Sequence, residues 1–418
     1  MSSERFTSLK NLARGKSPFS VYPIMLSGVI MAGGLGYEHR HEAMADLAGI
    51  SRSVVGDEFT ARLESVYFLA ADRKERVRYG ILGGQTNPFE DPQKEEQESK
   101  LDQLVLKDIP VEPSYELLKQ EVSKPTPLVL PEVKKLQAEY EEGEGAWTTE
   151  GLPRTSPEDI LMAKTFVRPD VSRPYASVGA LILDKRRIKL NMVGGPESPG
   201  GDRGVRGFGR IPDADRSDLL VAWNGGFQGP HGGFGMYADG KQYRPLVKGL
   251  ASVAVAKDGT ITMGEWGRTL FWNDDLIAVR QNAALLVEDC EVSKLASEQG
   301  QNNDIWGYVD VNTTKFITWR SAIGLTKNGD LLVAAGSNLS AASLARALWA
   351  VGACTAMQLD INSPYVLTSL FSKQSDGSVK ASRFMNSMSD NPARFLETQP
   401  RDFMYVTFKN EKSSRDQE

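Results

Sequence analysis

The pattern of apolar and polar positions is most informative between Thr318 and Pro364. Two apolar runs, Ser321–Leu325 and Leu331–Ala335, flank a polar stretch that contains Asn328 and Gly329. An Asn-Gly pair between two such runs favours a β-hairpin closed by a two-residue turn. This part of the chain therefore predicts a hairpin.

The hairpin is followed by a pattern typical of a short amphipathic helix and then a buried strand. Ser340 is placed to cap the helix, and its apolar residues recur at a spacing that makes one face: Leu344, Ala345, Leu348 and Val351. Thr355–Leu359 predicts a strand that presents Asp360 and Asn362 at its end. A carboxylate there, opposite Arg320 at the start of another strand, predicts a reaction centre and hence an enzyme.

The same β-rich character extends over residues 146–410. Apolar or alternating runs recur throughout: Ala176–Leu183, Arg187–Val193, Leu219–Trp223, Ser252–Ala256, Thr260–Gly264, Ile277–Val279, Leu285–Glu288 and Asp402–Lys409. Because helical patterns are few, we expect an α+β protein, with a β-rich catalytic domain of mixed or antiparallel sheets. Residues 411–418 are expected to form a disordered tail.

Three further segments are expected before this domain. Residues 1–37 join basic residues to an apolar run at Phe19–Tyr37, which indicates a signal or membrane anchor, with a buried N-terminal element as the alternative. Residues 38–84 predict a helical accessory region. Residues 85–145 are rich in Glu, Lys, Gln and Pro and predict a solvated, protease-sensitive linker.

Composition excludes several classes of function. The 418-residue chain has a net charge of −5, which leaves no basic excess for a primary role on nucleic acid. Three histidines are too few for a multi-histidine metal site. Two cysteines, Cys290 and Cys354, exclude a disulfide scaffold and a cysteine-based zinc cluster. We expect buried free thiols, although a single bridge between them stays open.

A second segment with chemical potential directly follows an apolar strand. Trp223 is followed by Asn224-Gly225-Gly226-Phe227, and such glycines let backbone approach a ligand and turn N–H groups toward an anion. A glycine-rich corner without a ligand is the alternative. Arg280, Asn282 and Arg320 also lie near predicted strand ends, which favours a shared site.

These segments resemble the phosphodiester glycosidase family, in particular the catalytic domain of N-acetylglucosamine-1-phosphodiester α-N-acetylglucosaminidase and the related bacterial envelope proteins linked to exopolysaccharide. The resemblance rests on Asn224–Phe227, Arg320–Gly324 and Leu344–Asp360, with Arg173–Ala176 and Arg401–Phe403 similar to the bacterial branch. It departs at Asp360-Ile361-Asn362-Ser363-Pro364, where family members usually carry Asp-Gly-Gly-Gly-Ser. Pro364 removes an N–H donor from that loop.

The resemblance implies a role for each candidate residue. Asp360 would act as acid, base or nucleophile, with a turn-capping aspartate as the alternative. Arg320 would clamp phosphate, with an ion pair to Asp310 as the alternative, and Arg280 is a second candidate for the clamp. The substrate-binding residues would be Asn224, Gly225, Gly226, Phe227, Arg280, Asn282 and Asn362. Glu197 is the candidate for a second carboxylate, with a solvated loop glutamate as the alternative.

The chain is therefore expected to be an envelope-associated hydrolase, exported or membrane-anchored, that cleaves a glycosyl phosphodiester or a related exopolysaccharide linkage. A non-catalytic carbohydrate-binding or structural envelope protein is the alternative, as is a cytoplasmic location. The expected partner is a carbohydrate or sugar phosphate rather than nucleic acid. No cofactor is expected, and Asp239, Asp360 and Asn362 are the oxygen ligands that a divalent cation could use.

Overall fold

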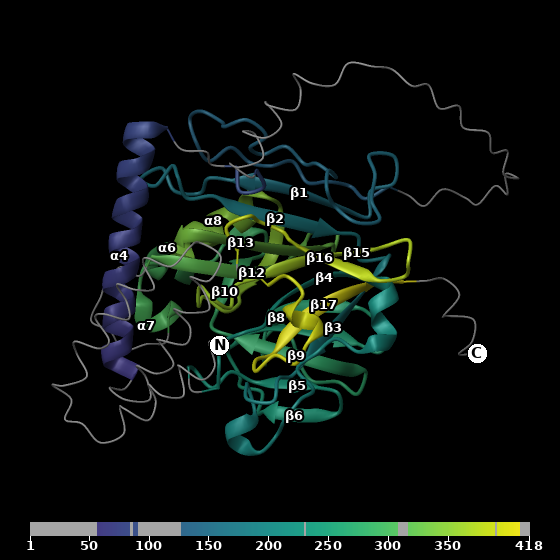
Figure 1. Cartoon of the computed structure of the whole chain (residues 1–418). Coiled ribbons are helices and arrows are strands. Elements are labelled where there is room, and N and C mark those ends of the chain that lie inside the picture. The colour runs from purple at the N-terminus through teal and green to yellow at the C-terminus, as the bar shows by residue number, and fades with distance from the viewer. Residues whose placement is uncertain are drawn as a thin grey trace, which may run out of the picture.

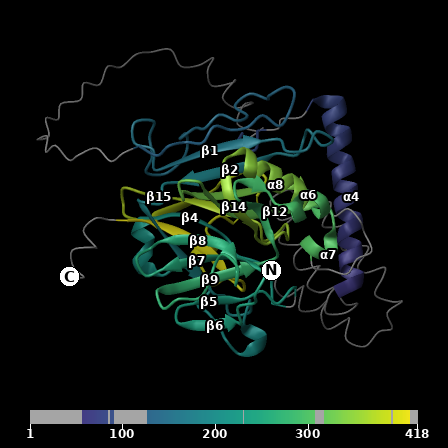
Figure 2. The same ribbon diagram turned by 180° about the vertical axis from the view of Figure 1, so that it is seen from behind.

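The computed structural model describes residues 57–83, 87–90, 127–229, 231–307, 317–388 and 391–409. The expected N-terminal segment 1–37 and tail 411–418 lie outside these residues. All pairings between the named strands are antiparallel. The strands form three sheets, which Figures 1 and 2 show from opposite sides. The expected β-rich architecture with few helices is confirmed, and its sheets are antiparallel.

The largest sheet contains the hairpin and the strand predicted around Asp360. Its seven strands, in spatial order, are β1 (Met162–Val167), β2 (Val178–Leu183), β13 (Leu331–Leu339), β12 (Thr318–Thr326), β14 (Ala353–Gln358), β10 (Leu285–Glu288) and β11 (Glu291–Val292). We call it the seven-stranded sheet.

The described residues also form two five-stranded sheets. The β4 sheet runs in the order β16 (Val379–Arg383), β15 (Thr368–Lys373), β4 (Leu219–Asn224), β17 (Phe403–Phe408) and β3 (Ile188–Val193). The β9 sheet runs in the order β6 (Lys241–Arg244), β5 (Met236–Ala238), β9 (Leu276–Asn282), β7 (Ala251–Ala256) and β8 (Ile261–Glu265).

The helices lie outside the sheets. The α-helices are α4 (Asp57–Leu82), α6 (Lys294–Gln299), α7 (Asn303–Trp306) and α8 (Ala341–Ala350), and the 3-10 turns are η2 (Gly201–Arg203), η3 (Asp213–Asp218) and η4 (Arg394–Leu396). The predicted N-cap of α8 is confirmed, because Ser340 Oγ accepts from the Ser343 N–H at 3.1 Å. Within the described residues, no helix is both long and apolar enough to cross a membrane.

Alternation along β12 divides the interior into two cores. Ile323 and Leu325 join the main core, which the seven-stranded sheet shares with residues of the other two sheets. Ala322 points the opposite way and packs with Leu344 and Leu348 of α8. Successive side chains of a strand face opposite sides, so the two faces of the sheet carry separate apolar sets.

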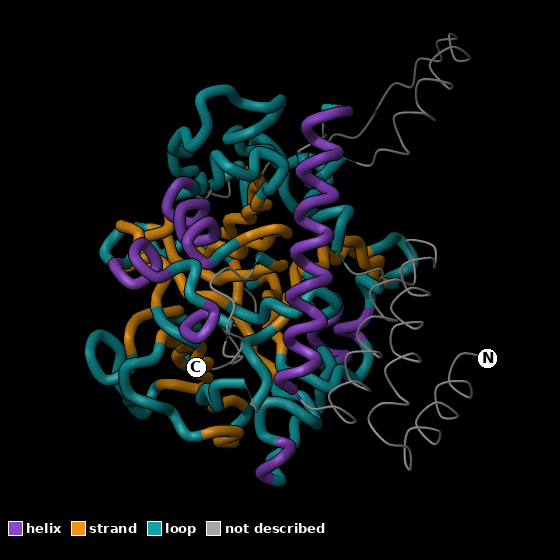
Figure 3. The backbone as a smooth tube through the Cα atoms, turned by 90° about the vertical axis from the view of Figure 1, so that its left-hand side faces the viewer, coloured by secondary structure: helices purple, strands orange, loops and turns teal. Residues whose placement is uncertain are grey.

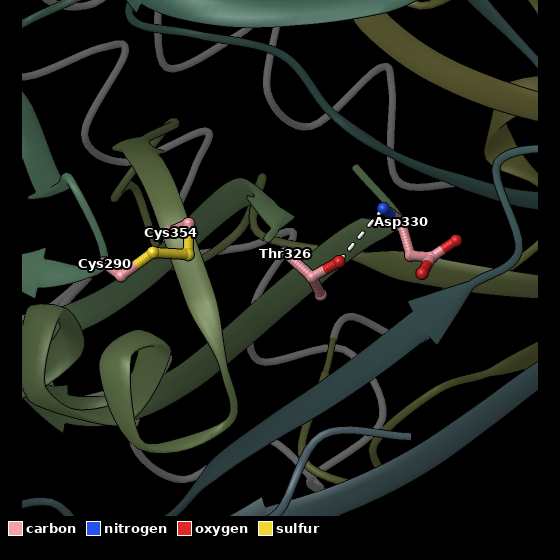
Figure 4. Close-up of a disulfide and its surroundings, with 4 residues drawn as sticks. All are labelled: Cys290, Thr326, Asp330 and Cys354. Carbon is pink, nitrogen blue, oxygen red and sulfur yellow. Dashed lines mark hydrogen bonds between the residues drawn. A yellow bond between two sulfur atoms is a disulfide. The ribbon is translucent and has the colours of Figure 1, made fainter. Parts of the chain in front are cut away.

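The β12–β13 hairpin differs from the expected two-residue turn. The Gly329 N–H donates to Thr326 O, and the Thr326 N–H donates to Asp330 O, which leaves three residues in the loop. Gly329 has φ +84°, as expected for a type I turn that closes with a left-handed glycine. The Asp330 N–H also donates to Thr326 Oγ1 at 3.0 Å, as Figure 4 shows. This extra hydrogen bond helps to hold the longer loop.

The expectation of free thiols is wrong. Cys290 and Cys354 form a disulfide, although they are 64 residues apart, and no free cysteine remains. Strand pairing explains the contact, because β10 and β14 are antiparallel neighbours. The Cys290 N–H also donates to Cys354 O at 2.9 Å. Periodicity within one segment does not reveal such a pairing.

Residues 127–145, expected to belong to a solvated linker, pack against the domain. Leu128 is buried, the Lys134 N–H donates to Ala350 O at 2.9 Å, and the Lys134 ammonium lies 3.6 Å from the centroid of the Trp349 ring. Buried Arg168 also donates to Glu144 at 2.8 Å. Some of the charged residues of this segment therefore contact the domain. The expected linker residues 91–126 lie outside the described residues.

Helix α4 lies along one side of the sheets, where it is seen in Figures 1 and 3. The helical region expected within residues 38–84 contains this element. Asp72 of this helix is buried and accepts from Tyr175 Oη at 2.8 Å and from Arg173 Nε at 3.2 Å. The Arg173–Ala176 segment therefore anchors the helix.

Candidate functional site

Asp360 lies two residues beyond the end of β14, inside a tight set of hydrogen bonds. Its Oδ1 accepts from the N–H groups of Ile361 at 2.8 Å and Asn362 at 3.1 Å. Its Oδ2 accepts from Arg401 Nη1 at 2.6 Å. The side chains of this ion pair are only 8% and 11% exposed, so the charges face each other with little water between them. The site is built around this pair.

Arg401 is fixed on three sides and precedes β17 by two residues. Besides Asp360, its Nε and Nη2 face Gln228, whose amide is oriented so that the oxygen accepts from both. The guanidinium carbon lies 3.3 Å from the centroid of the Tyr365 ring, a cation–π contact. A guanidinium held in one orientation is suited to bidentate binding of phosphate or carboxylate.

A second arginine supports the loop that carries Asp360. Arg394 of η4 donates to Pro364 O at 3.0 Å and to Tyr365 O. Burial, with the nearby positive charge of Arg401, lowers the pKa of Arg394 to about 10. One guanidinium thus contacts the carboxylate and a second binds the loop beside it, and this excess of positive charge favours an anionic ligand.

The predicted segment after β4 meets Asp360 through its backbone and through Ser321. The Asp360 N–H donates to Gly225 O at 3.0 Å, and Ser321 Oγ donates to Asp360 O at 2.7 Å. Asn224 Nδ2 donates to Ser321 Oγ at 2.9 Å, and Asn224 Oδ1 accepts from the Leu367 N–H at 3.2 Å. Asn224 is 5% exposed and ties together the strand ends that position Asp360.

Gly225 and Gly226 direct their N–H groups to Asp402. The Gly225 N–H donates to Asp402 O at 3.0 Å and the Gly226 N–H to Asp402 Oδ2 at 3.2 Å. A Cβ on Gly225 would lie 2.0 Å from Asp402 Oδ2, and one on Gly226 would lie 2.7 Å from Arg280 Cζ. Close packing against this acid and this arginine accounts for both glycines.

Arg280, expected as a second phosphate clamp, is paired inside the protein. Its side chain is fully buried, and its Nε donates to Asp402 Oδ2 at 2.8 Å. The other donors go to Asp402 Oδ1 and to the carbonyls of Phe227, Phe234 and Gln281, so all five N–H groups have partners. In this structure Arg280 supports the glycine loop and is unavailable to a ligand.

Arg320 also lies away from Asp360. It precedes Ser321 in β12 and therefore faces the α8 side of the sheet, where it donates to Leu339 O at 3.0 Å and to Gln358 Oε1. The side chain is 2% exposed, and burial lowers its pKa to about 9. The structure therefore does not bring the expected clamp to the carboxylate. Its alternative partner Asp310 lies outside the described residues.

The remaining candidates have backbone partners. Asn282 is fully buried and donates to Gln358 O at 2.6 Å. Phe227 is buried, and its ring lies 5.9 Å from that of Phe234. Asn362 is half-buried, and its backbone carbonyl accepts from the Tyr365 N–H at 2.8 Å. Asn362 is thus the one of these three that lies in the Asp360 loop.

Glu197 borders this site by way of its backbone. Its N–H donates to Pro400 O at 3.1 Å, next to Arg401, and its side chain is exposed. Ser198 Oγ accepts from the Gly229 N–H at 3.2 Å, which connects this loop to the loop of Gln228. The described residues contain no group of three or more His, Cys, Asp or Glu side chains that could hold a metal ion.

Sequence reasoning missed the residues that contact Asp360 most directly. The sequence places Arg401 only in a motif similar to the bacterial branch, and it does not single out Tyr365, Arg394 or Gln228. The available signal was position, since Arg401 precedes a predicted strand and Gln228 ends the glycine segment. Position alone does not show which strand ends meet.

No protein-family model matches the sequence, and no curated protein matches it significantly. Similar solved structures include the catalytic domain of zebrafish N-acetylglucosamine-1-phosphodiester α-N-acetylglucosaminidase, auto-inhibited by its pro-peptide. The two chains are 19% identical, the TM-score is 0.39, and the match covers 62% of this chain and 87% of the zebrafish chain. A hypothetical protein from Synechocystis has 12% identity and a TM-score of 0.33, with coverage of 60% and 63%. Similarity this distant assigns neither an activity nor a functional residue.

Proposed function

We propose that this chain is a hydrolase that cleaves a glycosyl phosphodiester or a related exopolysaccharide linkage. The observation that carries the proposal is the Asp360–Arg401 pair, with Arg394 beside it. The residue resemblance described above agrees with this reading. Arg401 takes the role first expected of Arg320, because Arg401 is the arginine that contacts the carboxylate.

The chemistry needs one carboxylate and one cationic clamp. Water adds to the anomeric carbon, the bond from that carbon to the phosphate oxygen breaks, and the phosphate leaves as an anion. Arg401 would bind the phosphate oxygens and stabilise the charge that collects on them. Asp360 would take the proton of the attacking water or stabilise the positive charge that develops on the sugar.

This division of roles reduces the need for a second carboxylate. A phosphate group leaves readily as an anion once its charge is balanced, so a cationic clamp can replace much of the work of a general acid. Glu197, on the loop that borders Arg401, is the residue that could still assist the departing oxygen. Glu197→Gln should therefore affect turnover less than Asp360→Asn.

The test is hydrolysis of nucleotide sugars and synthetic sugar-1-phosphodiesters by the full chain, with released sugar measured. Asp360→Asn should abolish turnover, and Arg401→Ala should raise KM and lower kcat together. Arg268→Ala is the control, since Arg268 forms an exposed ion pair with Glu265 elsewhere. Full activity in either site variant would contradict the assignment.

A non-catalytic carbohydrate-binding protein is the second candidate, and one observation favours it. Asp360 already accepts two backbone N–H groups on one oxygen and Arg401 on the other, so little of its acceptor capacity remains for a reacting water. In that case the panel would give no turnover. Sugar phosphates would instead raise the melting temperature, and Arg401→Ala would remove that rise.

We also propose that the protein acts outside the cytoplasm, in the cell envelope. The Cys290–Cys354 disulfide supports this, because such bonds persist mainly in oxidising compartments. Trapping thiols with a maleimide in intact cells should leave both cysteines unlabelled. Quantitative labelling would place the chain in a reducing compartment.

A further inference from the structure

The outer face of the β9 sheet carries an apolar layer that is separate from the main core. Tyr237 of β5 pairs with Val279 of β9, and Val279 pairs with Ala254 of β7, so these residues form one row across the sheet. Val279 and Ala254 belong to a small cluster with Trp266, Leu270 and Leu276, and Tyr237 packs against it. The segment from Trp266 to Leu276 therefore covers this face only in part.

Large apolar side chains stay exposed beside this cluster. Phe271 is 58% exposed, Trp272 47% and Ile277 38%. The Trp272 ring meets the Tyr237 ring edge to face, with centroids 5.0 Å apart and planes at 89°. This contact holds the indole in one orientation without covering it. We call Tyr237, Phe271, Trp272 and Ile277 the aromatic surface.

The size of the aromatic surface argues against a second copy of the chain as its occupant. An aromatic side chain buries roughly 150–250 Å² when fully covered, so two half-exposed rings present on the order of 200 Å². A stable protein interface needs about 800 Å² from each partner. The surface fits a ligand of a few rings much better than a folded partner.

The polar rim of the aromatic surface narrows the chemistry of the ligand. Asn273, Asp274 and Asp275 follow Trp272 directly, and Asp275 lies 3.9 Å from Lys257. Carboxylates and amides can bind hydroxyl groups, and two acids beside one lysine disfavour a polyanion. A pyranose with equatorial substituents combines a flat face of C–H groups with a rim of hydroxyls, which matches exposed rings bordered by such side chains.

We infer that the aromatic surface is a second carbohydrate-binding site, one that stacks the rings of a neutral glycan on Trp272 and Phe271. This site is distinct from the Asp360–Arg401 pair, which is cationic and suited to an anion. The inference does not require turnover at Asp360. A chain with both sites would hold a polymer at one surface and act on, or bind, a phosphorylated unit at the other.

The test is isothermal titration calorimetry of the full chain with cellohexaose and chitohexaose, two neutral glycans with flat, equatorially substituted rings. Trp272→Ala should weaken binding about tenfold or more, as is typical of an aromatic anchor, and Trp272→Tyr should keep part of it. Phe208→Ala is the matched control, since Phe208 is 74% exposed and lies under Lys241 rather than at this surface. Hydrolysis of a small sugar-1-phosphodiester, measured beside it, should be the same in Trp272→Ala and the unmodified chain.

Three results would overturn the inference. The unmodified chain could bind neither hexaose, or Trp272→Ala could bind as tightly as the unmodified chain. Sedimentation could also show self-association that Trp272→Ala abolishes, in which case the occupant is a second copy. A failure of hydrolysis alone would reject the proposed function and leave hexaose binding intact, so the two failures are distinguishable.

Discussion

Replacing Asp402 by Asn should destabilise the fold strongly, because it leaves a buried charge without its partner. The Arg280 side chain is fully buried and that of Asp402 is 2% exposed. Asp402 accepts from Arg280 Nε at 2.8 Å, from Arg280 Nη2 at 3.2 Å and from the Gly226 N–H at 3.2 Å. Removing one partner of such a pair costs about 3–5 kcal/mol, and Asn, which keeps one acceptor, should fall near the lower value.

The assay is urea unfolding followed by tryptophan fluorescence, with midpoints compared at equal slopes. Asp159→Asn is the matched control, since Asp159 pairs with Arg187 but is 58% exposed, and its loss should cost roughly 0–1 kcal/mol. If Asp402→Asn lies as close to the unmodified chain as this control does, the buried pair does not hold the glycine loop. The reasoning would then be refuted.

Replacing both partners should not restore stability. Arg280 also donates to the carbonyls of Phe227, Phe234 and Gln281, and these acceptors would be left unpaired in an apolar substitution. Arg280→Met combined with Asp402→Leu should therefore remain less stable than the unmodified chain. A double variant as stable as the unmodified chain would show that the pair is replaceable by packing alone.

Three further outcomes can be measured. Burial raises the pKa of Tyr243 to about 12, whereas the unfolded phenol ionises near pH 10. The contribution of this phenol to the unfolding free energy is therefore present below pH 10 and lost between pH 10 and 12. Tyr243→Phe should flatten the fall in unfolding free energy over this range. Reducing the Cys290–Cys354 bond should lower the unfolding free energy by about 2–4 kcal/mol, and a Cys290→Ser, Cys354→Ser double variant should not respond to reductant. Trypsin should cut after Lys134 in urea-unfolded protein but not in native protein, because the Lys134 N–H donates to Ala350 O. Rapid cleavage of the native protein at this site would contradict the packing of residues 127–145 against the domain.

Local patterns predicted the hairpin, α8 and β14, because each depends on residues close in sequence. Ser340 caps α8 as expected, β12 and β13 cover the predicted runs, and β14 overlaps the predicted Thr355–Leu359 but ends at Gln358. The turn at Gly329 differs because the strands close one residue further out than an Asn-Gly pair alone suggests. The pattern within one segment therefore predicts where a helix or strand lies better than it predicts where that element ends.

The partners of each charged residue could not be predicted in the same way. Arg320 and Arg401 both lie near strand ends in the sequence, yet one is buried on the α8 side and the other meets Asp360, 41 residues away. Which arginine reaches the carboxylate depends on strand order, on the face each side chain takes and on the irregular register near Thr318. These are properties of the assembled sheets.

The altered loop at Asp360 and the glycines after β4 have different physical explanations. Gly225 and Gly226 are required by the packing of Asp402 and Arg280, so their presence does not by itself indicate an anion-binding backbone. The Asp360 loop ends at Pro364, which has no N–H, and the N–H groups of Ile361 and Asn362 already donate to Asp360 Oδ1. The anion recognition that we propose would therefore depend on arginine side chains, and first on Arg401. Under the proposed function, a loop without the glycines usual in the phosphodiester glycosidase family would depend on Arg401 to balance the charge of the phosphate.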